Sequence, residues 1–208
     1  VSMPDIVELV AVIDPDTLRL NEGIADFGLS PGLCFRSLDG FFTSGASADA
    51  AIVATPDASH CMIGIHVLEH GLSLLLEKPM AVTENECMEL VAAVTAAESR
   101  SSSLSTGLCY VLRYHPYYNR IKELSAHPEL GRITAVHHRI YIGIDRMTHT
   151  FVRGLWSRSE GSSPIFLSKC CHDVDWLFSL VGCRSIDDVA QIVSSGSLMR
   201  YCLSSAPD

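Results

Sequence analysis

The sequence lacks several features that mark other classes of protein. No run of about 18 uninterrupted apolar residues occurs, so no membrane span is expected. The first residues show no basic segment followed by an apolar one, so no signal peptide is visible. The formal net charge is −9, and no cluster of lysine or arginine offsets it. Because a phosphate backbone attracts positive charge, no nucleic-acid partner is expected.

Paired cysteines are also missing. The chain has 8 cysteines, but they are scattered and form no CxxC pair. Cys170-Cys171 has no second ligand pair, and structural zinc usually needs four paired ligands, so no metal site is predicted. Several cysteines lie in apolar segments, where a free thiol behaves as a small hydrophobic side chain. These features favour reduced thiols in a cytoplasmic protein over a disulfide scaffold.

The chain contains enough apolar residues for a sizeable core. Of its 208 residues, 48% are hydrophobic and 19% are charged, which suits one large domain or two small ones. The most informative stretch is 71–79, an apolar run that ends in Glu77, Lys78 and Pro79. Such a run, bounded by Gly and Pro, predicts a strand buried on both faces. Ligands of open α/β sheets lie beyond the carboxyl ends of the strands, so Lys78 is expected over a ligand crevice, with Pro79 a candidate for a cis peptide.

The first half of the chain alternates between predicted strands and helices. Two further strands are expected at 6–13 and 49–54, which end in Asp14-Pro15 and Thr55-Pro56. The pattern predicts helices at 16–27, 58–70 and 83–98, the last beginning with a Thr-x-x-Glu capping box. Asp57 or Ser59 is expected to cap the middle helix, and 28–45 shows no regular pattern.

The second half of the sequence is predicted to contain strands, helices and one irregular segment. Strands are expected at 104–112, 134–142 and 186–195, helices from 113 to about 127 and from 164 to 182, and an irregular segment at 143–161. A domain boundary is placed between residues 106 and 107.

Glu77-Lys78-Pro79 after a buried strand, preceded by Ala54-Thr55-Pro56 and His60, resembles the Gfo/Idh/MocA oxidoreductases. The resemblance implies a Rossmann-type doubly wound parallel sheet at 1–106. A partial α+β domain with a mostly antiparallel sheet is then expected at 107–208. No GxGxxG turn occurs anywhere, so the sheet is expected to lack its first strand and the chain to be a fragment truncated at both ends.

The resemblance also implies an NAD(P) cofactor, a small-molecule substrate and, in the full-length protein, a homo-oligomer. The expected cofactor-binding residues are Asp14, Thr55, Pro56, His60, Glu77, Lys78, Pro79 and Arg113. A carboxylate after the second Rossmann strand accepts hydrogen bonds from ribose hydroxyls, so Asp14 favours NAD over NADP. The alternative for Asp14 is a strand-ending Asp-Pro turn.

Catalytic roles are expected for Lys78, His172 and Lys169, and substrate contacts for Lys78, His172 and Asp175. Lys169 and His172 lie three positions apart on the predicted helix, and Asp175 lies three beyond, where its carboxylate could orient the His172 ring. Polyol dehydrogenases of the family carry an aspartate four residues before the histidine, where this chain has Ser168.

Two functions follow from these expectations. The first is an NAD(P)-dependent dehydrogenase acting on a sugar, polyol or related hydroxy compound. The second is a non-catalytic relative with a regulatory or assembly role, because fold alone does not determine function.

Overall fold

The computed structural model describes residues 5–154, 157, 163–164, 166–183, 188–191 and 193. The chain divides into two compact units, Val1–Ala51 and Ile52–Asp208. The predicted domain boundary between residues 106 and 107 stays a prediction.

The first unit is built on a short parallel pair of strands. Val12 of β1 lies opposite Cys34 of β2, and Ile13 lies opposite Phe35. Its elements are β1 (Val12–Ile13), α1 (Thr17–Phe27), the 3₁₀ turn η1 (Pro31–Leu33), β2 (Cys34–Phe35) and α2 (Leu38–Thr43). The predicted strand at 6–13 is therefore shorter than expected, and β2 lies where no regular element was predicted. Two-residue strands are too short to show an alternating pattern, which is why the sequence did not reveal β2.

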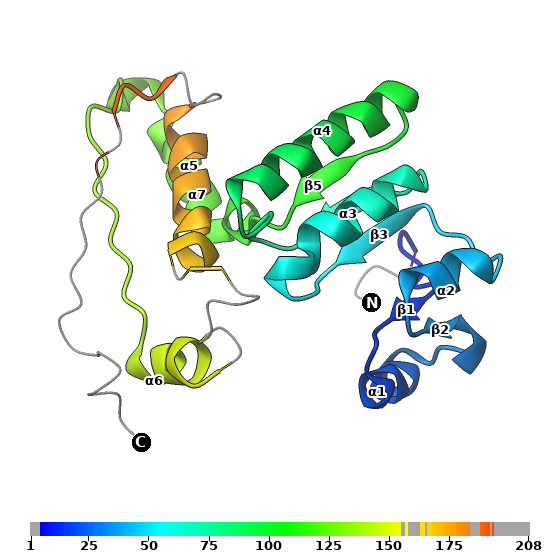
Figure 1. Ribbon diagram of the computed structural model, residues 1–208. Helices are drawn as coiled ribbons and strands as arrows, with labels where there is room; N and C mark the ends of the chain where they lie inside the picture. Colours follow the sequence, from blue (N-terminus) through cyan, green and yellow to red (C-terminus); the bar gives the residue numbers. More distant parts are fainter. Residues whose placement is uncertain are drawn as a thin grey trace. The chain divides into compact units, whose positions relative to one another are not determined.

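A three-stranded sheet in the order β3-β4-β5 follows. Strands β4 and β5 run parallel, with Leu75 opposite Gly107. The elements are β3 (Ala50–Val53), η2 (Asp57–Ser59), α3 (His60–Glu69), β4 (Ser73–Leu76), α4 (Glu84–Arg100) and β5 (Thr106–Leu108). Helices α3 and α4 pack against each other, and α3 also packs on β4 (Figure 1). This alternation of parallel strands and helices confirms the Rossmann-like α/β class.

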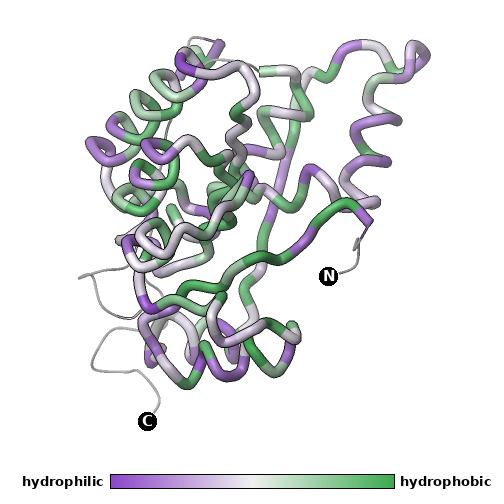
Figure 2. The backbone as a smooth tube through the Cα atoms, turned by 90° about the vertical axis from the view of Figure 1, so that its right-hand side faces the viewer, coloured by the Kyte–Doolittle hydropathy of each residue, from purple (hydrophilic) through white to green (hydrophobic). Residues whose placement is uncertain are grey.

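The contact between α3 and α4 depends on a glycine. A side chain at Gly64 would begin 3.1 Å from a methyl group of Leu90 and 3.4 Å from one of Leu74. Leu90, Leu68 and Val67 are buried around this contact. The helices in Figure 2 change between hydrophilic and hydrophobic along their length, as helices with one buried face do.

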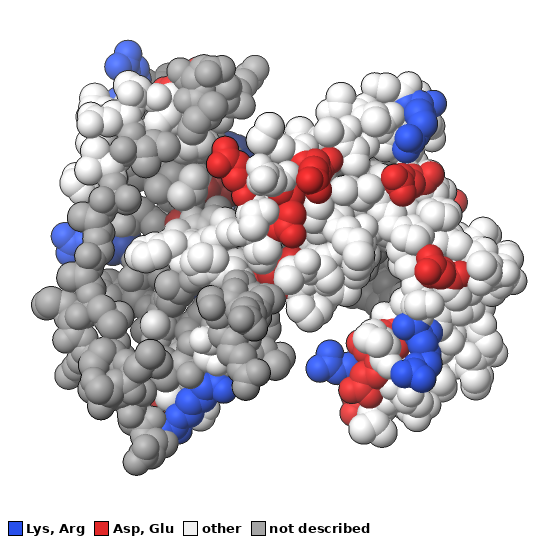
Figure 3. Space-filling view, viewed as in Figure 1, with Lys and Arg blue, Asp and Glu red and all other residues white. Residues whose placement is uncertain are grey.

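Helix α4 begins with the predicted capping box. The Thr83 hydroxyl accepts the Glu86 N–H at 3.2 Å, and the Glu86 carboxylate accepts the Thr83 N–H at 3.0 Å. Acidic residues stand in the first turn and Arg100 in the last, and Figure 3 shows the acidic side chains over the start of α4. Both placements complement the helix dipole and stabilise the helix after β4.

Strand β4 differs from the prediction in its burial. Leu74 and Leu76 are buried, but Leu75 keeps 40% of its surface exposed. The expectation that both faces of this strand are buried is therefore wrong for the described residues, because α3 and α4 cover only one face of the sheet there.

The chain after β5 is mainly helical. It forms η3 (Val111–Tyr114), α5 (Pro116–Ser125), η4 (Pro128–Leu130), α6 (Ile144–Arg146), the π-helical turns η5 (Met147–Val152) and η7 (Phe166–Cys170), and α7 (Cys171–Val181). The helices predicted at 113–127 and 164–182 are thus confirmed in type for the described residues, but α5 begins only at Pro116 and a π-helical turn precedes α7. No described helix is long and apolar enough to span a membrane.

Two strand predictions in this half fail or lie outside the described residues. Residues 134–142 are not a strand, and the turns α6 and η5 occupy part of the segment expected to be irregular. An alternating pattern gives a strand only where a partner strand supplies hydrogen bonds, and the described residues supply none for 134–142. Most of the predicted strand at 186–195 lies outside the described residues.

Helix α7 is held against the segments that follow β5. The Arg113 guanidinium bonds both carboxylate oxygens of Asp175 at 2.7 Å, and Lys122 Nζ donates to Ser179 Oγ at 2.7 Å. The rings of Tyr118 and Trp176 meet edge to face at 4.9 Å. These contacts determine which face of α7 turns toward Lys78.

Candidate functional site

Lys78 stands at the carboxyl end of β4, as predicted. The Glu77 N–H donates to Val53 O at 2.9 Å, which joins the ends of β4 and β3. The Lys78–Pro79 peptide bond is cis, also as predicted. Lys78 Nζ donates to the carbonyl of Ser168 at 3.1 Å, so the ammonium group lies at the turn that leads into α7.

His172 lies in the first turn of α7, beside this lysine. Its ring meets that of Tyr110 edge to face at 5.9 Å, and its buried Nδ1 has no hydrogen-bond partner among the described residues. Burial lowers the pKa of His172, and the positive charge of Lys78 lowers it further. Both effects favour the neutral ring, which is the form that accepts a proton.

Lys169 belongs to the same group of charges. Burial lowers its pKa first, and the charges of Lys78 and Arg146 lower it further. Burial also raises the pKa of Cys171, while Lys78 opposes that shift. The structure therefore brings the three predicted catalytic side chains, Lys78, Lys169 and His172, together around the start of α7.

Tyr110 was not predicted as part of this group. Burial raises its pKa to about 12, so its hydroxyl stays protonated at neutral pH. A tyrosine in the predicted strand at 104–112 gave no sequence signal, because the contact with His172 joins residues far apart in the chain.

Asp175 does not orient His172, contrary to expectation. Both of its carboxylate oxygens are taken by Arg113, and this hydrogen bonding is the main cause that raises the pKa of Arg113. Helical spacing put Asp175 within reach of His172, but the bidentate partner from η3 competes for the carboxylate. The structure shows Arg113 in this pair; its predicted cofactor contact stays a prediction.

A buried polar chain that the sequence did not reveal lies next to Lys78. Asp57 accepts a hydrogen bond from the Ser163 hydroxyl, which also lies 2.7 Å from Ser168 Oγ. All three residues are buried. The predicted capping of α3 by Asp57 or Ser59 is wrong, because the Asp57 carboxylate turns to Ser163 and Ser59 makes no side-chain cap. The Ser168 hydroxyl is thus engaged with Ser163, while the Ser168 carbonyl accepts from Lys78.

His60 links two of the predicted cofactor-binding segments. Its Nδ1 lies 2.7 Å from Pro79 O, and its Nε2 lies 2.8 Å from Thr55 O. His60 and Pro79 are buried, whereas Pro56 is exposed. The Thr55 hydroxyl accepts a hydrogen bond from Ser59 at 2.8 Å.

Glu77 turns back toward its own backbone. Its carboxylate accepts the Lys78 N–H at 3.1 Å. Burial raises the pKa of Cys109, and the nearby Glu77 carboxylate raises it further. Glu77 therefore shapes the turn after β4 and lies beside the segment that follows β5.

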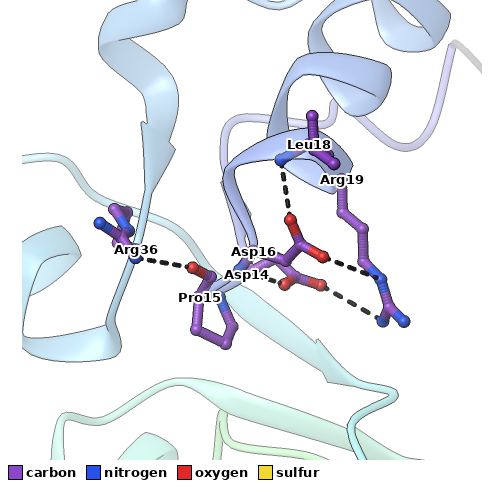
Figure 4. A network of polar contacts seen from close by, with 6 residues as sticks. All are labelled: Asp14, Pro15, Asp16, Leu18, Arg19 and Arg36. Carbon is purple, nitrogen blue, oxygen red and sulfur yellow. Dashed lines mark hydrogen bonds and ion pairs between the residues drawn. The ribbon is translucent and has the colours of Figure 1, made fainter.

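Asp14 ends β1 in the first unit (Figure 4). Its carboxylate accepts the Asp16 N–H at 2.8 Å, and Arg19 lies 3.9 Å from its other oxygen. Asp16 caps α1 by accepting the Leu18 N–H, and Arg36 donates to Pro15 O at 3.0 Å. The carboxylate expected to bind ribose thus stands at a strand end, as predicted, but with two guanidinium groups nearby.

The fold and these residues define the class of protein. Parallel strands joined by helices, with a lysine at a strand end and a histidine beside it, are typical of dinucleotide-binding oxidoreductases. A sequence model described as "Oxidoreductase family, NAD-binding Rossmann fold" (Gfo/Idh/MocA) matches residues 2–105, which is half of the chain. The chain belongs to this family, and the family assignment and its NAD-binding fold are confirmed.

The chain is similar to longer bacterial proteins. The chain is 28% identical to protein y4oX of Sinorhizobium fredii over 86% of this chain and 48% of that protein. It is 26% identical to inositol 2-dehydrogenase of Corynebacterium glutamicum over 90% of this chain and 50% of the relative. The chain thus spans about half the length of these relatives.

A solved structure shows the same fold. The scyllo-inositol dehydrogenase of Lactobacillus casei, crystallised with NAD(H) and scyllo-inositol, aligns with a TM-score of 0.69. Its sequence is 20% identical, and the alignment covers 84% of this chain and 48% of that one.

The residues present fit a nicotinamide dinucleotide. In the second unit, the buried His172 Nδ1 lacks a partner beside a lysine at a strand end, which is the edge where such ligands bind. In the first unit, Asp14 supplies a carboxylate at a strand end.

Proposed function

We propose that the protein is an NAD(P)-dependent dehydrogenase that oxidises a hydroxyl group of a polyol, sugar or related compound. The observation that carries the proposal is the placement of Lys78 and His172. Lys78 Nζ lies at the start of α7, and its charge together with burial lowers the pKa of His172. An ammonium group beside a neutral imidazole is suited to stabilising an alkoxide and removing its proton.

Each residue has a defined part in this reaction. A bound nicotinamide would supply the acceptor for the hydride that leaves the alcohol carbon. His172 takes the hydroxyl proton through its imidazole ring, which its lowered pKa keeps neutral. Lys78 stabilises the negative charge that develops on the oxygen. Lys169 adds positive charge; burial lowers the pKa of His172 most, Lys78 lowers it further, and Lys169 contributes least.

Cofactor and substrate contacts complete the proposal. Asp14 binds the adenosine ribose and favours NAD, while Thr55, Pro56, Glu77 and Pro79 line the cofactor side of the sheet edge. The relatives named inositol dehydrogenases make cyclic polyols the first substrates to test. The substrate contacts are assigned to Lys78 and His172. Asp175 is withdrawn from direct contact, because Arg113 holds its carboxylate.

The test is turnover by the whole protein that contains these residues. Purified protein is offered NAD or NADP with myo-inositol, scyllo-inositol and a panel of aldoses, and reduced cofactor is followed by absorbance. We expect turnover of at least one compound, lost in His172→Asn and kept in His137→Asn, a matched change at an exposed histidine. Equal activity of both variants would refute the role of His172, and no turnover with any compound would refute the dehydrogenase assignment for this panel.

The second candidate, a non-catalytic relative, is favoured by one observation. Where polyol dehydrogenases are expected to carry an aspartate, Ser168 has a buried hydroxyl bonded to Ser163. Calorimetry decides between the two. Binding of NAD without turnover of any substrate supports the second candidate, whereas turnover excludes it.

We also propose a homo-oligomeric, cytoplasmic protein. The described cysteines are free, which suits a reducing compartment. Light scattering of the whole protein tests the oligomer, and a monomer at micromolar concentration would refute it. Fractionation of the source cells tests the compartment.

A further inference from the structure

A buried histidine joins the two loops that lead to the proposed site. His60 is the first residue of α3 and is 1% exposed. Its ring nitrogens lie 2.7 Å from Pro79 O and 2.8 Å from Thr55 O. Both partners are carbonyl oxygens, which only accept, so both contacts are hydrogen bonds when both ring nitrogens carry a proton. No other cofactor candidate among the described residues has its side chain within hydrogen-bond distance of the backbone of two separate loops.

The two carbonyl groups belong to the ends of neighbouring strands. Thr55 follows β3, and Pro79 follows β4 one residue after Lys78. The backbones of the two strand ends are already joined by the bond from Glu77 N to Val53 O. His60 adds a second link farther out, where the chain turns away from the sheet.

Lys78 lies between these two links along the chain. The residue before it, Glu77, is held by the hydrogen bond from its N–H to Val53 O. The residue after it, Pro79, has its carbonyl next to His60 Nδ1. The Lys78 side chain reaches the Ser168 carbonyl at 3.1 Å, so a shift of the backbone at 78–79 would move the ammonium group relative to that carbonyl. Small displacements of a reacting group, on the order of 1 Å, can cost about 10²-fold in rate.

We propose that His60 is a positioning residue that couples the Thr55 loop to the Pro79 loop and thereby sets the position of Lys78. The ring does not touch substrate or cofactor, because it is buried and both nitrogens face backbone carbonyls. The inference rests on the proposed function in one respect, namely that the position of Lys78 affects the rate.

Hydrogen exchange tests the coupling without any assay of activity. The variants are His60→Gln, whose amide can reach one carbonyl but not both, and His60→Ala. The control is His70→Ala, at an exposed histidine of the same segment. We expect faster exchange in the peptides covering 54–59 and 77–82 of both His60 variants, including the Glu77 amide, and unchanged exchange in α4.

Two outcomes would overturn the coupling. Unchanged exchange in the two loops would show that His60 does not hold them. Equally faster exchange throughout α4 would show general destabilisation instead of a local link. If His60→Ala fails to fold, His60→Gln alone decides the result.

Kinetics of the whole protein test the link to Lys78. We expect His60→Gln to lower kcat by roughly 10- to 10²-fold with a smaller change in KM. In a Lys78→Met background the same change should have little further effect on kcat, because the group being positioned is gone. A full multiplicative loss in the double variant would refute the positioning role, even if the protein is the proposed dehydrogenase.

Discussion

Replacing Lys78 by methionine is the most informative perturbation of the proposed site. Methionine keeps much of the length of the side chain but removes the ammonium group, which donates to Ser168 O at 3.1 Å. The same group lowers the pKa values of His172 and Lys169. One substitution therefore changes both the charge that faces the alkoxide and the protonation of the base.

The expected loss of activity is large. General acid–base and electrostatic help by one positioned group is worth about 10²–10⁴-fold, or roughly 2.7–5.4 kcal/mol of barrier. Lys78→Met should therefore lower kcat by that factor and change KM less, because the interaction strengthens in the transition state. Lys122→Met is the matched control, since Lys122 also donates one hydrogen bond, to Ser179.

The pH dependence of the rate tests the effect of Lys78 on His172 independently. His172 must be neutral to accept a proton, so the rate falls as pH drops through its pKa. Burial and Lys78 lower that pKa, which places the fall below the ordinary pH range of histidine. Without Lys78 the pKa of His172 should rise, and the acid limb of the kcat/KM profile should move to higher pH.

Two measurements test whether Lys78 lowers the pKa of His172. They are steady-state rates across pH and an NMR titration of the His172 ring. A large drop in kcat with an unmoved acid limb would show that Lys78 does not act on His172. Lys78→Ala and His172→Ala together should cost less than the product of the single losses, because groups acting as a unit are not additive. If Lys169→Ala is more damaging than His172→Ala, the proton passes through Lys169 and the assignment of His172 fails.

Three further outcomes are expected. Asp14→Ala should shift cofactor preference toward NADP by roughly fivefold or more, because a charge pair at about 4 Å is worth ~1–4 kcal/mol; calorimetry with both cofactors measures it, and an unchanged ratio refutes ribose binding. Thr83→Ala should cost about 1 kcal/mol of unfolding free energy, or roughly 2–4 °C in Tm, through loss of the capping box. Thr95→Ala on the same helix is its control, and equal melting of the two contradicts the cap. Gly64→Val should cost about 1–3 kcal/mol by overpacking against Leu90, whereas Gly143→Val, which meets open space, should be nearly neutral; denaturant unfolding compares them.

Local signals predicted the elements that carry the site. The apolar run before Glu77-Lys78-Pro79 gave β4 and the position of Lys78, and the Thr-x-x-Glu pattern gave the start of α4. These features depend on residues within one turn or one strand, which a sequence pattern contains in full. The strand at 134–142 failed because pairing needs a second segment that its own pattern does not specify.

Contacts between distant residues could not be predicted in the same way. Asp175 pairs with Arg113 across 62 positions, and Ser163 bonds Asp57 across 106. Helical spacing alone made Asp175 a neighbour of His172, because it says which side chains share a face but not which partner from another element competes for them.

The polar groups around His172 are bonded elsewhere, and this shapes the chemistry of the site. Arg113 holds Asp175, His138 holds Asp173 at 2.7 Å, and Ser163 holds the hydroxyl of Ser168. Among the described residues, His172 Nδ1 thus has no hydrogen-bond partner. Burial and the charge of Lys78 lower the pKa of His172, and the charges of Asp173 and Glu77 only partly oppose that shift. A base with a lowered pKa removes a hydroxyl proton well only if that proton is made more acidic, and Lys78 supplies the charge that does so. The lysine that weakens the base is therefore also the group that makes a weak base sufficient.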